Sequence, residues 1–407
     1  MKRGIATFAA VLLVISTPSL VPAQGRFPLK YEPSGGDQSY LLMSSGRFVR
    51  ALEAKPGQLK GVPKDFVGGG TYFQVRLGQE DVLFALDGSK PPKLYVDTNR
   101  DGNLSDEKPF EAATGKKGEG LELIGGALTF GPVSVAGGEK GAETRLNIMA
   151  YGASFLRICP AGLMSGQVRL GGQDYQVAVV DSNFDGRYDK TFTLPTAAGP
   201  EGVEYETFAI CRSAERALGE AYEAGAVQPL PKMLRVKDVY YSLKVSGDGS
   251  AVEIEKAEPR MGTLDVGQVG AELLLWSENG AHRLSGADGK WQLAAGKYSA
   301  KVAWLSRTDG TGAKWTLRGD CSDSEKLGMF EVLAGQTLSI KMGPPLTAKT
   351  EVQTEPGQAY VRLMILGQAG EEYSAAVMKG DKEQPAPELR ILSESGRVLQ
   401  TGSFEYG

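Results

Sequence analysis

Two short segments carry oxygen-bearing side chains at alternate positions and then a glycine. Segment 97–102 reads Asp-Thr-Asn-Arg-Asp-Gly, and segment 181–186 reads Asp-Ser-Asn-Phe-Asp-Gly. A tight loop of this kind turns alternate side chains inward, and the glycine permits the sharp bend that follows them. Converging carboxylate and amide oxygens are the ligands that hard divalent cations prefer, and Ca²⁺ takes six to eight of them. Both segments therefore predict a calcium site.

The first loop resembles the calcium loop of EF-hand proteins. That resemblance implies oxygen ligands at positions 1, 3, 5, 7 and 9, which here are Asp97, Asn99, Asp101, the carbonyl of Asn103, and Ser105. Position 12 of an EF-hand is a bidentate glutamate, and here it is Lys108. Asp106, Glu107 or water must therefore close the first site.

The second loop, with a shorter D-x-N-x-D-G-x-x-D form, is more similar to the loops of dockerin and thrombospondin type-3 repeats. The resemblance implies ligands from Asp181, Asn183, Asp185, the carbonyl of Arg187, and Asp189. Position 12 is Phe192, so this loop has no closing glutamate of its own. Each loop follows an apolar strand instead of a helix, which predicts strand–loop sites with a structural ion. The alternative for either loop is an Asx turn that binds no ion.

The elements that position these loops belong to a repeated unit. Residues 74–78 and 167–171 are the same five residues, Gln-Val-Arg-Leu-Gly, and each copy leads through a second apolar strand into an acidic loop. The first copy carries an extra hairpin's worth of residues, through Pro91 and Pro92, before its loop. We interpret the common order of elements as a duplicated hairpin-plus-loop unit. Alternating apolar runs predict strands at 71–77, 82–86, 93–96, 175–180 and 239–245. One Ala- and Glu-rich stretch, 212–223, predicts a short helix.

The predicted fold is mainly β: a duplicated N-terminal β region with one short helix, followed by one or two small antiparallel β-sandwich modules. The expected divisions are 1–23, a signal peptide cut after Ala23; 24–39, an extended entry segment; 40–145 and 146–261, two β units with one calcium loop each; 262–345, an Ig-like sandwich; and 346–407, a C-terminal β module. Residues 293–298 resemble a turn of bacterial Ig-like and carboxypeptidase-regulatory-like sandwiches. The whole chain resembles uncharacterised exported bacterial proteins rich in such loops.

Several function classes lack support in the sequence. The one histidine, His282, lies in a polar stretch where we expect a solvated side chain, so neither a catalytic triad nor a zinc centre is indicated. The 45 basic and 49 acidic residues form no basic stripe, which disfavours nucleic-acid binding. After the signal, no apolar run is long enough to cross a bilayer. Cys159, Cys211 and Cys321 leave both a Cys159–Cys211 disulfide and three free thiols open.

These observations favour a non-catalytic secreted or periplasmic protein with structural Ca²⁺. Its expected role is surface attachment, recognition or envelope scaffolding, with an extracellular protein or glycan as partner. One alternative is a calcium-dependent carbohydrate-binding protein that uses the four tryptophans of residues 276–315. The other is a hydrolase with a carboxylate pair.

Overall fold

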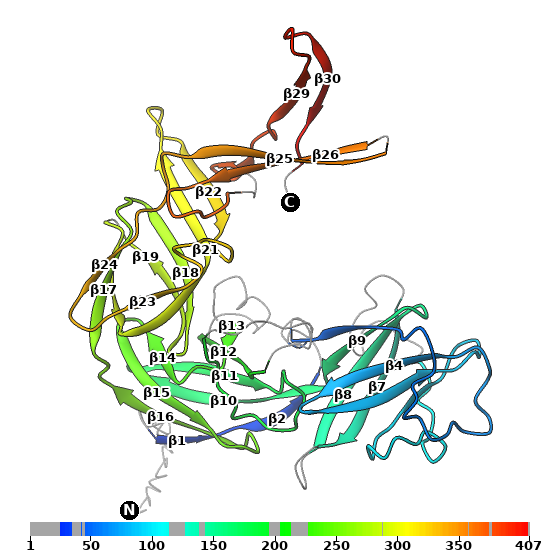
Figure 1. Ribbon diagram of the computed structural model, residues 1–407. Helices are drawn as coiled ribbons and strands as arrows, with labels where there is room; N and C mark the ends of the chain where they lie inside the picture. Colours follow the sequence, from blue (N-terminus) through cyan, green and yellow to red (C-terminus); the bar gives the residue numbers. More distant parts are fainter. Residues whose placement is uncertain are drawn as a thin grey trace, which may run out of the picture.

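The computed structural model describes residues 25–34, 42, 45–113, 127–137, 143–194, 204–212, 227–286, 288–356, 358–373 and 377–405. The elements of these residues are thirty β-strands in eight sheets (Figure 1). The prediction of a mainly β fold is therefore confirmed. Among the same residues, no helix has the length and apolar character needed to cross a membrane. The predicted signal peptide, residues 1–23, lies outside the described residues.

The first β unit packs two antiparallel sheets face to face. One has the order β3-β9-β8-β7, and the other has the order β4-β5-β6. Their bounds are β3 Arg47–Arg50, β4 Thr71–Leu77, β5 Glu80–Leu86, β6 Leu94–Val96, β7 Leu128–Ala136, β8 Glu143–Tyr151 and β9 Phe155–Pro160. Strand β4 shows why this pairing forms: Phe73, Val75 and Leu77 alternate with more exposed residues and enter the shared core.

The second β unit also has two sheets, ordered β13-β12-β11-β10-β2 and β1-β16-β15-β14. The predicted entry segment supplies β1 and β2, one to each sheet. Their bounds are β1 Gly25–Pro28, β2 Lys30–Pro33, β10 Gly162–Leu170, β11 Gln173–Val180, β12 Thr207–Arg212, β13 Val227–Pro229, β14 Met233–Val236, β15 Val239–Val245 and β16 Ala251–Ala257. The predicted helix at 212–223 falls outside the described residues except for Arg212, which is the last residue of β12.

Residues 261–339 form a β-sandwich around one core that includes Leu273, Trp291 and Tyr298. One sheet is β20-β17-β24, and the other is β19-β18-β21-β22-β27-β28 with β23 paired to β21. Their bounds are β17 Met261–Asp265, β18 Ala271–Ser277, β19 Gly280–Ser285, β20 Lys290–Ala294, β21 Gly296–Thr308, β22 Lys314–Asp320, β23 Phe330–Val332, β24 Thr337–Ser339, β27 Met378–Lys379 and β28 Lys382–Glu383.

Two further hairpins extend from the sandwich (Figure 1). They are β25 (Thr347–Glu355) with β26 (Gln358–Leu366), and β29 (Glu388–Leu392) with β30 (Val398–Ser403). Every described residue of β25 and β30 is exposed, so these hairpins contribute little to any core.

Candidate metal centre

The second acidic loop begins where β11 ends, and its backbone folds around its own side chains. The carboxylate of Asp181 accepts hydrogen bonds from the N–H groups of Asp185 at 3.1 Å and Gly186 at 3.0 Å. The side-chain oxygen of Asn183 accepts a second bond from the N–H of Asp185, at 2.9 Å. Gly186, with φ 80°, supplies the left-handed bend that the motif predicts. The side chains of positions 1, 3 and 5 are therefore turned into the loop.

The first acidic loop has the same hydrogen-bond pattern. Asp97 accepts from the N–H groups of Asp101 at 3.0 Å and Gly102 at 2.9 Å, and Asn99 accepts from Asp101 at 3.0 Å. Gly102 has φ 76°. Each loop is preceded by a hairpin that turns at a matching glycine with positive φ, Gly78 in β4–β5 and Gly171 in β10–β11. The second loop follows its hairpin directly, whereas the first loop follows a further strand, β6.

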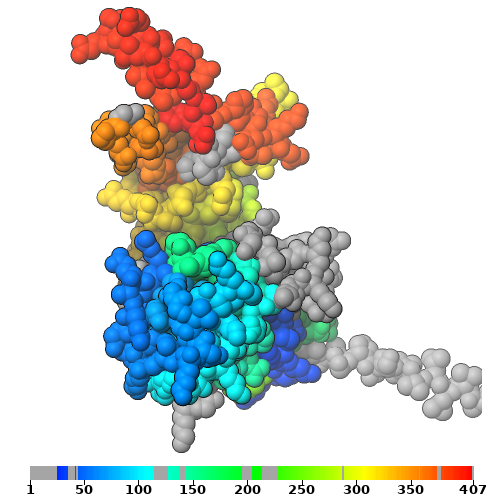
Figure 2. Space-filling model, turned by 90° about the vertical axis from the view of Figure 1, so that its right-hand side faces the viewer, coloured from blue at the N-terminus to red at the C-terminus, as the bar shows by residue number. Residues whose placement is uncertain are grey.

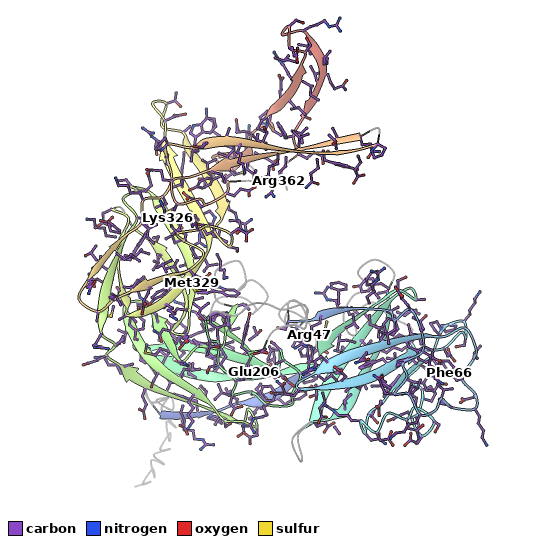
Figure 3. The ribbon with its side chains drawn as sticks, viewed as in Figure 1. Arg47, Phe66, Glu206, Lys326, Met329 and Arg362 are labelled. Carbon is purple, nitrogen blue, oxygen red and sulfur yellow. The ribbon has the colours of Figure 1, made fainter. Side chains whose placement is uncertain are left out.

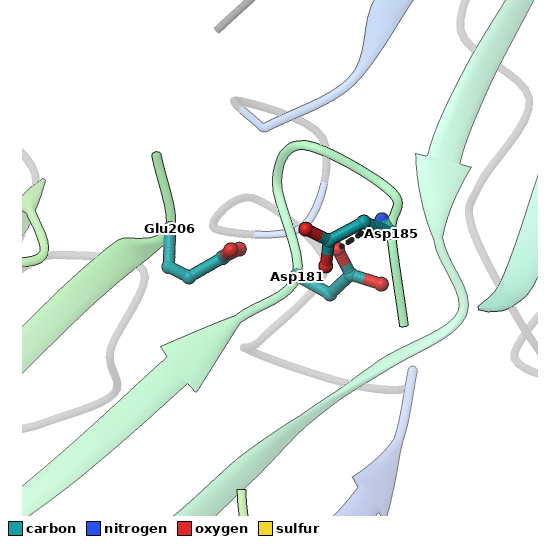
Figure 4. A group of neighbouring side chains, drawn as sticks. All are labelled: Asp181, Asp185 and Glu206. Atoms are coloured by element: carbon teal, nitrogen blue, oxygen red, sulfur yellow. Dashed lines mark hydrogen bonds between the residues drawn. The ribbon is translucent and has the colours of Figure 1, made fainter. Parts of the chain in front are cut away.

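Three carboxylates meet at the second loop. Asp181, Asp185 and Glu206 each place one oxygen within 4.8 Å of the other two (Figure 4). Asp181 is 6% exposed and Glu206 is fully buried, whereas Asp185 is partly exposed. Among the described residues this is the one group of three or more His, Cys, Asp or Glu side chains with metal-ligand spacing. Carboxylates that face one another in a buried site are costly to ionise unless a proton or a cation compensates their charge.

Glu206 is the functional candidate that the sequence motif missed. Its Oε2 accepts from the N–H of Ser182 at 2.9 Å, and its Oε1 accepts from Nδ2 of Asn183 at 2.9 Å, 23 residues earlier in the chain. The register of the sheet explains this meeting, because Val180 at the end of β11 pairs with Thr207 at the start of β12. Glu206 therefore stands opposite Asp181, and the sheet supplies the closing glutamate that the loop lacks.

Glu107 occupies the corresponding place in the first loop. It accepts hydrogen bonds from the N–H of Thr98 at 2.6 Å and from the Thr98 hydroxyl at 2.8 Å. Thr98 and Ser182 are both second residues of their loops, so each loop has one glutamate bound to the same backbone position. Asp106 instead accepts from Asn99 Nδ2, at 3.3 Å. Of the two closing residues that we considered for the first loop, Glu107 has the geometry shared with the second loop.

The two loops differ in burial, and burial shifts the pKa values of their carboxyl groups. Burial, together with the charge of the neighbouring Asp185, raises the pKa of Asp181 to about 7. Burial, together with the charges of Asp181 and Asp185, raises the pKa of Glu206 well above its usual range. Burial also raises the pKa of Asp97 and Glu107. Asn99 and Asp101 are exposed, so water reaches the first loop more easily.

Arg47 of β3 lies beside the three carboxylates of the second loop. Its Nη1 donates to the carbonyl of Arg76 at 3.0 Å, and its Nη2 donates to the carbonyl of Ser182 at 3.1 Å. Burial lowers the pKa of Arg47, and attraction to Asp181 and Glu206 offsets part of this effect. Figure 3 labels Arg47 and Glu206 between the two β units. The charge of Lys190 also lowers the pKa of Glu206, so two cationic side chains act on three carboxylates.

The second loop also joins the two β units. Phe184, at position 4, is fully buried in the core of the first unit, and the Arg47 guanidinium lies 4.8 Å from the centre of its ring. The carbonyl of Phe184 accepts from the Thr144 hydroxyl at 3.2 Å, and the carbonyl of Asn183 accepts from the N–H of Gly78 at 3.0 Å. The loop thus presents its carboxylates to one unit and its aromatic ring to the other.

The outer predicted ligands have partners within their own loops. Asp189 binds the side chain of Arg187 through two hydrogen bonds, Nε–Oδ1 at 3.0 Å and Nη2–Oδ2 at 2.7 Å. Its carboxylate is not one of the three that meet. In the first loop, the side-chain oxygen of Asn103 accepts from the N–H of Ser105 at 3.1 Å and from its hydroxyl at 2.8 Å.

The prediction of a solvated His282 is wrong. This residue of β19 is 3% exposed, and its ring centre lies 6.1 Å from that of Tyr240 and 5.9 Å from that of Tyr298. Burial lowers the pKa of His282 to about 3. The polar residues around it in the sequence concealed its alternation, because Gly280, His282 and Leu284 share the inner face of β19. Cys159, Cys211 and Cys321 form no disulfide in the structure.

No protein-family model, no curated protein and no solved structure matches this chain. The functional inference therefore rests on the geometry of the two loops.

Proposed function

We propose that this protein is a non-catalytic exported protein, secreted or periplasmic, whose acidic loops hold structural Ca²⁺. Its role would be surface attachment, recognition or envelope scaffolding. The observation that carries the proposal is the meeting of Asp181, Asp185 and Glu206 within 4.8 Å of one another inside a D-x-N-x-D-G loop. The loop geometry alone is compatible with an ordinary Asx turn, but two of these carboxylates are buried and have raised pKa values.

A cation would remove an electrostatic cost that the polypeptide leaves uncompensated. Ionised carboxylates are expensive to bury unless they are paired or coordinate a metal. At neutral pH in the absence of an ion, the fold must either protonate Asp181 and Glu206 or hold their charges close together. Calcium is the expected ion because it accepts carboxylate and carbonyl oxygens in flexible geometry. Sites of about 10⁻⁴–10⁻³ M affinity suffice outside the cell, where calcium is plentiful.

We expect the second loop to bind calcium more tightly than the first. Its closing glutamate is fully buried and is held by two hydrogen bonds to the loop. The first loop has two exposed ligand residues, Asn99 and Asp101, and its carboxylates do not reach the same mutual spacing. More of its coordination would have to come from water.

The tryptophans have structural surroundings, which disfavours the carbohydrate-binding alternative. The charged group of a lysine or arginine side chain lies over the ring of Trp276, Trp304 and Trp315, at 5.2, 4.9 and 4.8 Å from the respective ring centres. The fourth, Trp291, is 8% exposed in the sandwich core.

The spacing of the carboxylates disfavours the hydrolase alternative. The carboxylate oxygens at the second loop lie closer together than the carboxyl groups of glycosidases, which are about 5–9 Å apart. A shared cation suits that spacing better than a hydrolytic pair.

Thermal unfolding of the chain from Gln24 onward tests the proposal. The midpoint is measured with excess EDTA, with about 1–5 mM Ca²⁺ and with Mg²⁺. Binding to the native state alone raises the midpoint by mass action. We expect a rise specific to calcium that Asp181→Ala removes, that Asp97→Ala reduces, and that Asp248→Ala, in an exposed turn, leaves intact. An equal midpoint in EDTA and calcium, with no bound metal by elemental analysis, would refute structural calcium sites.

A further inference from the structure

The C-terminal hairpins concentrate exposed apolar side chains. Of the thirteen large apolar side chains that are exposed among the described residues, seven lie between residues 346 and 399: Leu346, Val352, Tyr360, Ile391, Leu392, Val398 and Leu399. Strand β25 is exposed at all nine positions, and its Val352 is 60% exposed. Figure 2 shows this end of the chain projecting beyond the sandwich.

Strand β25 is also a free sheet edge. Its one strand partner among the described residues is β26, along which it pairs from Thr347↔Leu366 to Glu355↔Gln358. An isolated two-stranded hairpin is marginally stable in water, and an uncapped edge is a template for another strand. The other hairpin does not cover this edge: it faces β26 instead, across a groove that Val361, Leu363 and Ile391 line. Arg362, labelled in Figure 3, marks the middle of β26.

We propose that β25 pairs antiparallel with β25 of a second copy of this chain, across a two-fold axis at Val352. Charge complementarity within the strand identifies the occupant. Lys349 and Glu355 lie at equal distances in sequence on either side of Val352. In this register each Lys349 stands opposite Glu355 of the second copy, and the two Val352 side chains face each other. Directly opposite charges and β-branched pairs stabilise antiparallel sheets.

Other registers pair these residues less well. An axis at Glu351 would place two Glu351 carboxylates opposite each other, and like charges directly opposite are destabilising. An axis at Thr350 would pair Lys349 with Glu351 but would place Glu355 opposite Pro345, outside β25, and so leave it without a charged partner. The register at Val352 pairs both Lys349 and Glu355, with Ala348 opposite Pro356 just beyond the end of the strand. The register at Val352 keeps the Lys349–Glu351 ion pair of the hairpin, at 3.1 Å, beside the new Lys349–Glu355 pair.

The proposed pairing also extends one face of the hairpin. Cross-strand partners share a face, so Val352 and Val361 lie together, with Thr350 beside Leu363. The same face of β26 lines the groove against β29 and β30. A four-stranded sheet β26-β25-β25-β26 would carry this Thr- and Val-rich face without interruption from one copy to the other. The number of paired strands would then exceed the three that independent stability requires.

Sedimentation equilibrium and cysteine cross-linking of the full chain test this pairing. All variants carry Cys211→Ser, because Cys159 and Cys321 are already buried. We expect a dimer at micromolar concentration, and Val352→Cys should form an intermolecular disulfide upon oxidation. Thr350→Cys is the matched control: in this register residue 350 stands opposite residue 354, so its two copies lie four residues apart along the strands, beyond the reach of a disulfide.

Charge variants test the register without a change of shape. Lys349→Glu should raise the dimer dissociation constant about tenfold or more, because both cross-strand pairs become repulsive. Lys349→Glu/Glu355→Lys should restore it, and Lys382→Glu, an exposed lysine of β28, should leave it unchanged. A monomeric chain would overturn the proposal, as would a dimer that Lys349→Glu does not weaken or that cross-links through residue 350 in preference to 352. The expected result is the same in EDTA and calcium, so its failure is separable from failure of the metal sites.

Discussion

Replacing Asp181 with asparagine separates the charge of the second loop from its shape. Asparagine keeps a side-chain oxygen for the N–H of Asp185 but loses the second anionic oxygen, which accepts from Gly186 at 3.0 Å. It also removes one of three carboxylates that lie within 4.8 Å of one another. We therefore expect Asp181→Asn to stabilise the ion-free protein at pH 8 and to abolish its response to calcium.

The magnitude follows from the pKa. Because the pKa of Asp181 rises from 3.8 to about 7 in the fold, ionising it above pH 7 costs at most about 4 kcal/mol relative to the unfolded chain. The loss of the oxygen that accepts from the N–H of Gly186 costs about 1–3 kcal/mol. The net gain in EDTA is about 1–3 kcal/mol, or about 2–10 °C in the unfolding midpoint of this part of the chain.

The assay is thermal unfolding in EDTA across pH 4–8 for the parent chain and the variant. A group with a raised native pKa stabilises the fold below its unfolded pKa, and that contribution is lost as the pH rises through the native value. The parent chain should therefore lose this contribution between about pH 4 and 7, and Asp181→Asn should not. Asp248→Asn is the matched control, since hydrogen bonds from Ser246 and Ser250 lower the pKa of that exposed aspartate to about 2. A destabilised Asp181→Asn protein that still responds to calcium would refute the reasoning.

Three further predictions concern Glu206, Phe184 and His282. Glu206→Gln should reduce the calcium affinity, measured by calorimetry, about tenfold or more. Glu204→Gln, exposed in the same segment, should leave the affinity unchanged, and equal affinities of the two variants would exclude Glu206 as a ligand. Phe184→Ala should cost about 3–5 kcal/mol in the free energy of denaturant unfolding, because the side chain is fully buried, whereas Phe48→Ala, 62% exposed, should cost far less; similar losses would contradict the packing. Because the native pKa of His282 is lowered to about 3, its contribution to the free energy of unfolding should be lost as the pH falls from about 6.5 towards 3. His282→Phe should remove this pH dependence of stability from acid-unfolding curves. An unchanged pH dependence would assign it to other groups.

Local patterns predicted the strands well where one face is buried. The apolar alternation of 71–77 and 239–245 gave strands with the bounds that the structure has. The apolar run of residues 264–277 contains the end of β17 and all of β18, which are separate strands because Gly267 and Gly270 take positive φ between them. A hydrophobic pattern reports which residues are buried but is less sensitive to a turn inside an apolar run.

The metal centre was only half predictable for a topological reason. Asp181, Asn183 and Asp185 are neighbours in sequence, so their spacing is visible as a motif. Glu206 joins them only because β12 pairs with β11. A motif defined by spacing within one segment contains no information about the residues of the strand that pairs with it. The burial of Phe184 was equally hidden, since its core belongs to strands of the first unit.

The pairing of β1 and β2 has a consequence for the order in which the chain folds. Phe27 pairs with Val252, and Tyr31 pairs with Met164, so the first described residues complete sheets whose other strands come much later. Such non-local contacts raise the contact order and slow folding, because a long loop must close before they form. The second β unit therefore cannot complete both of its sheets until the chain has been synthesised to about residue 257. Strand β2 can pair as soon as β10 has been synthesised, whereas β1 has no strand partner until β16 has been made.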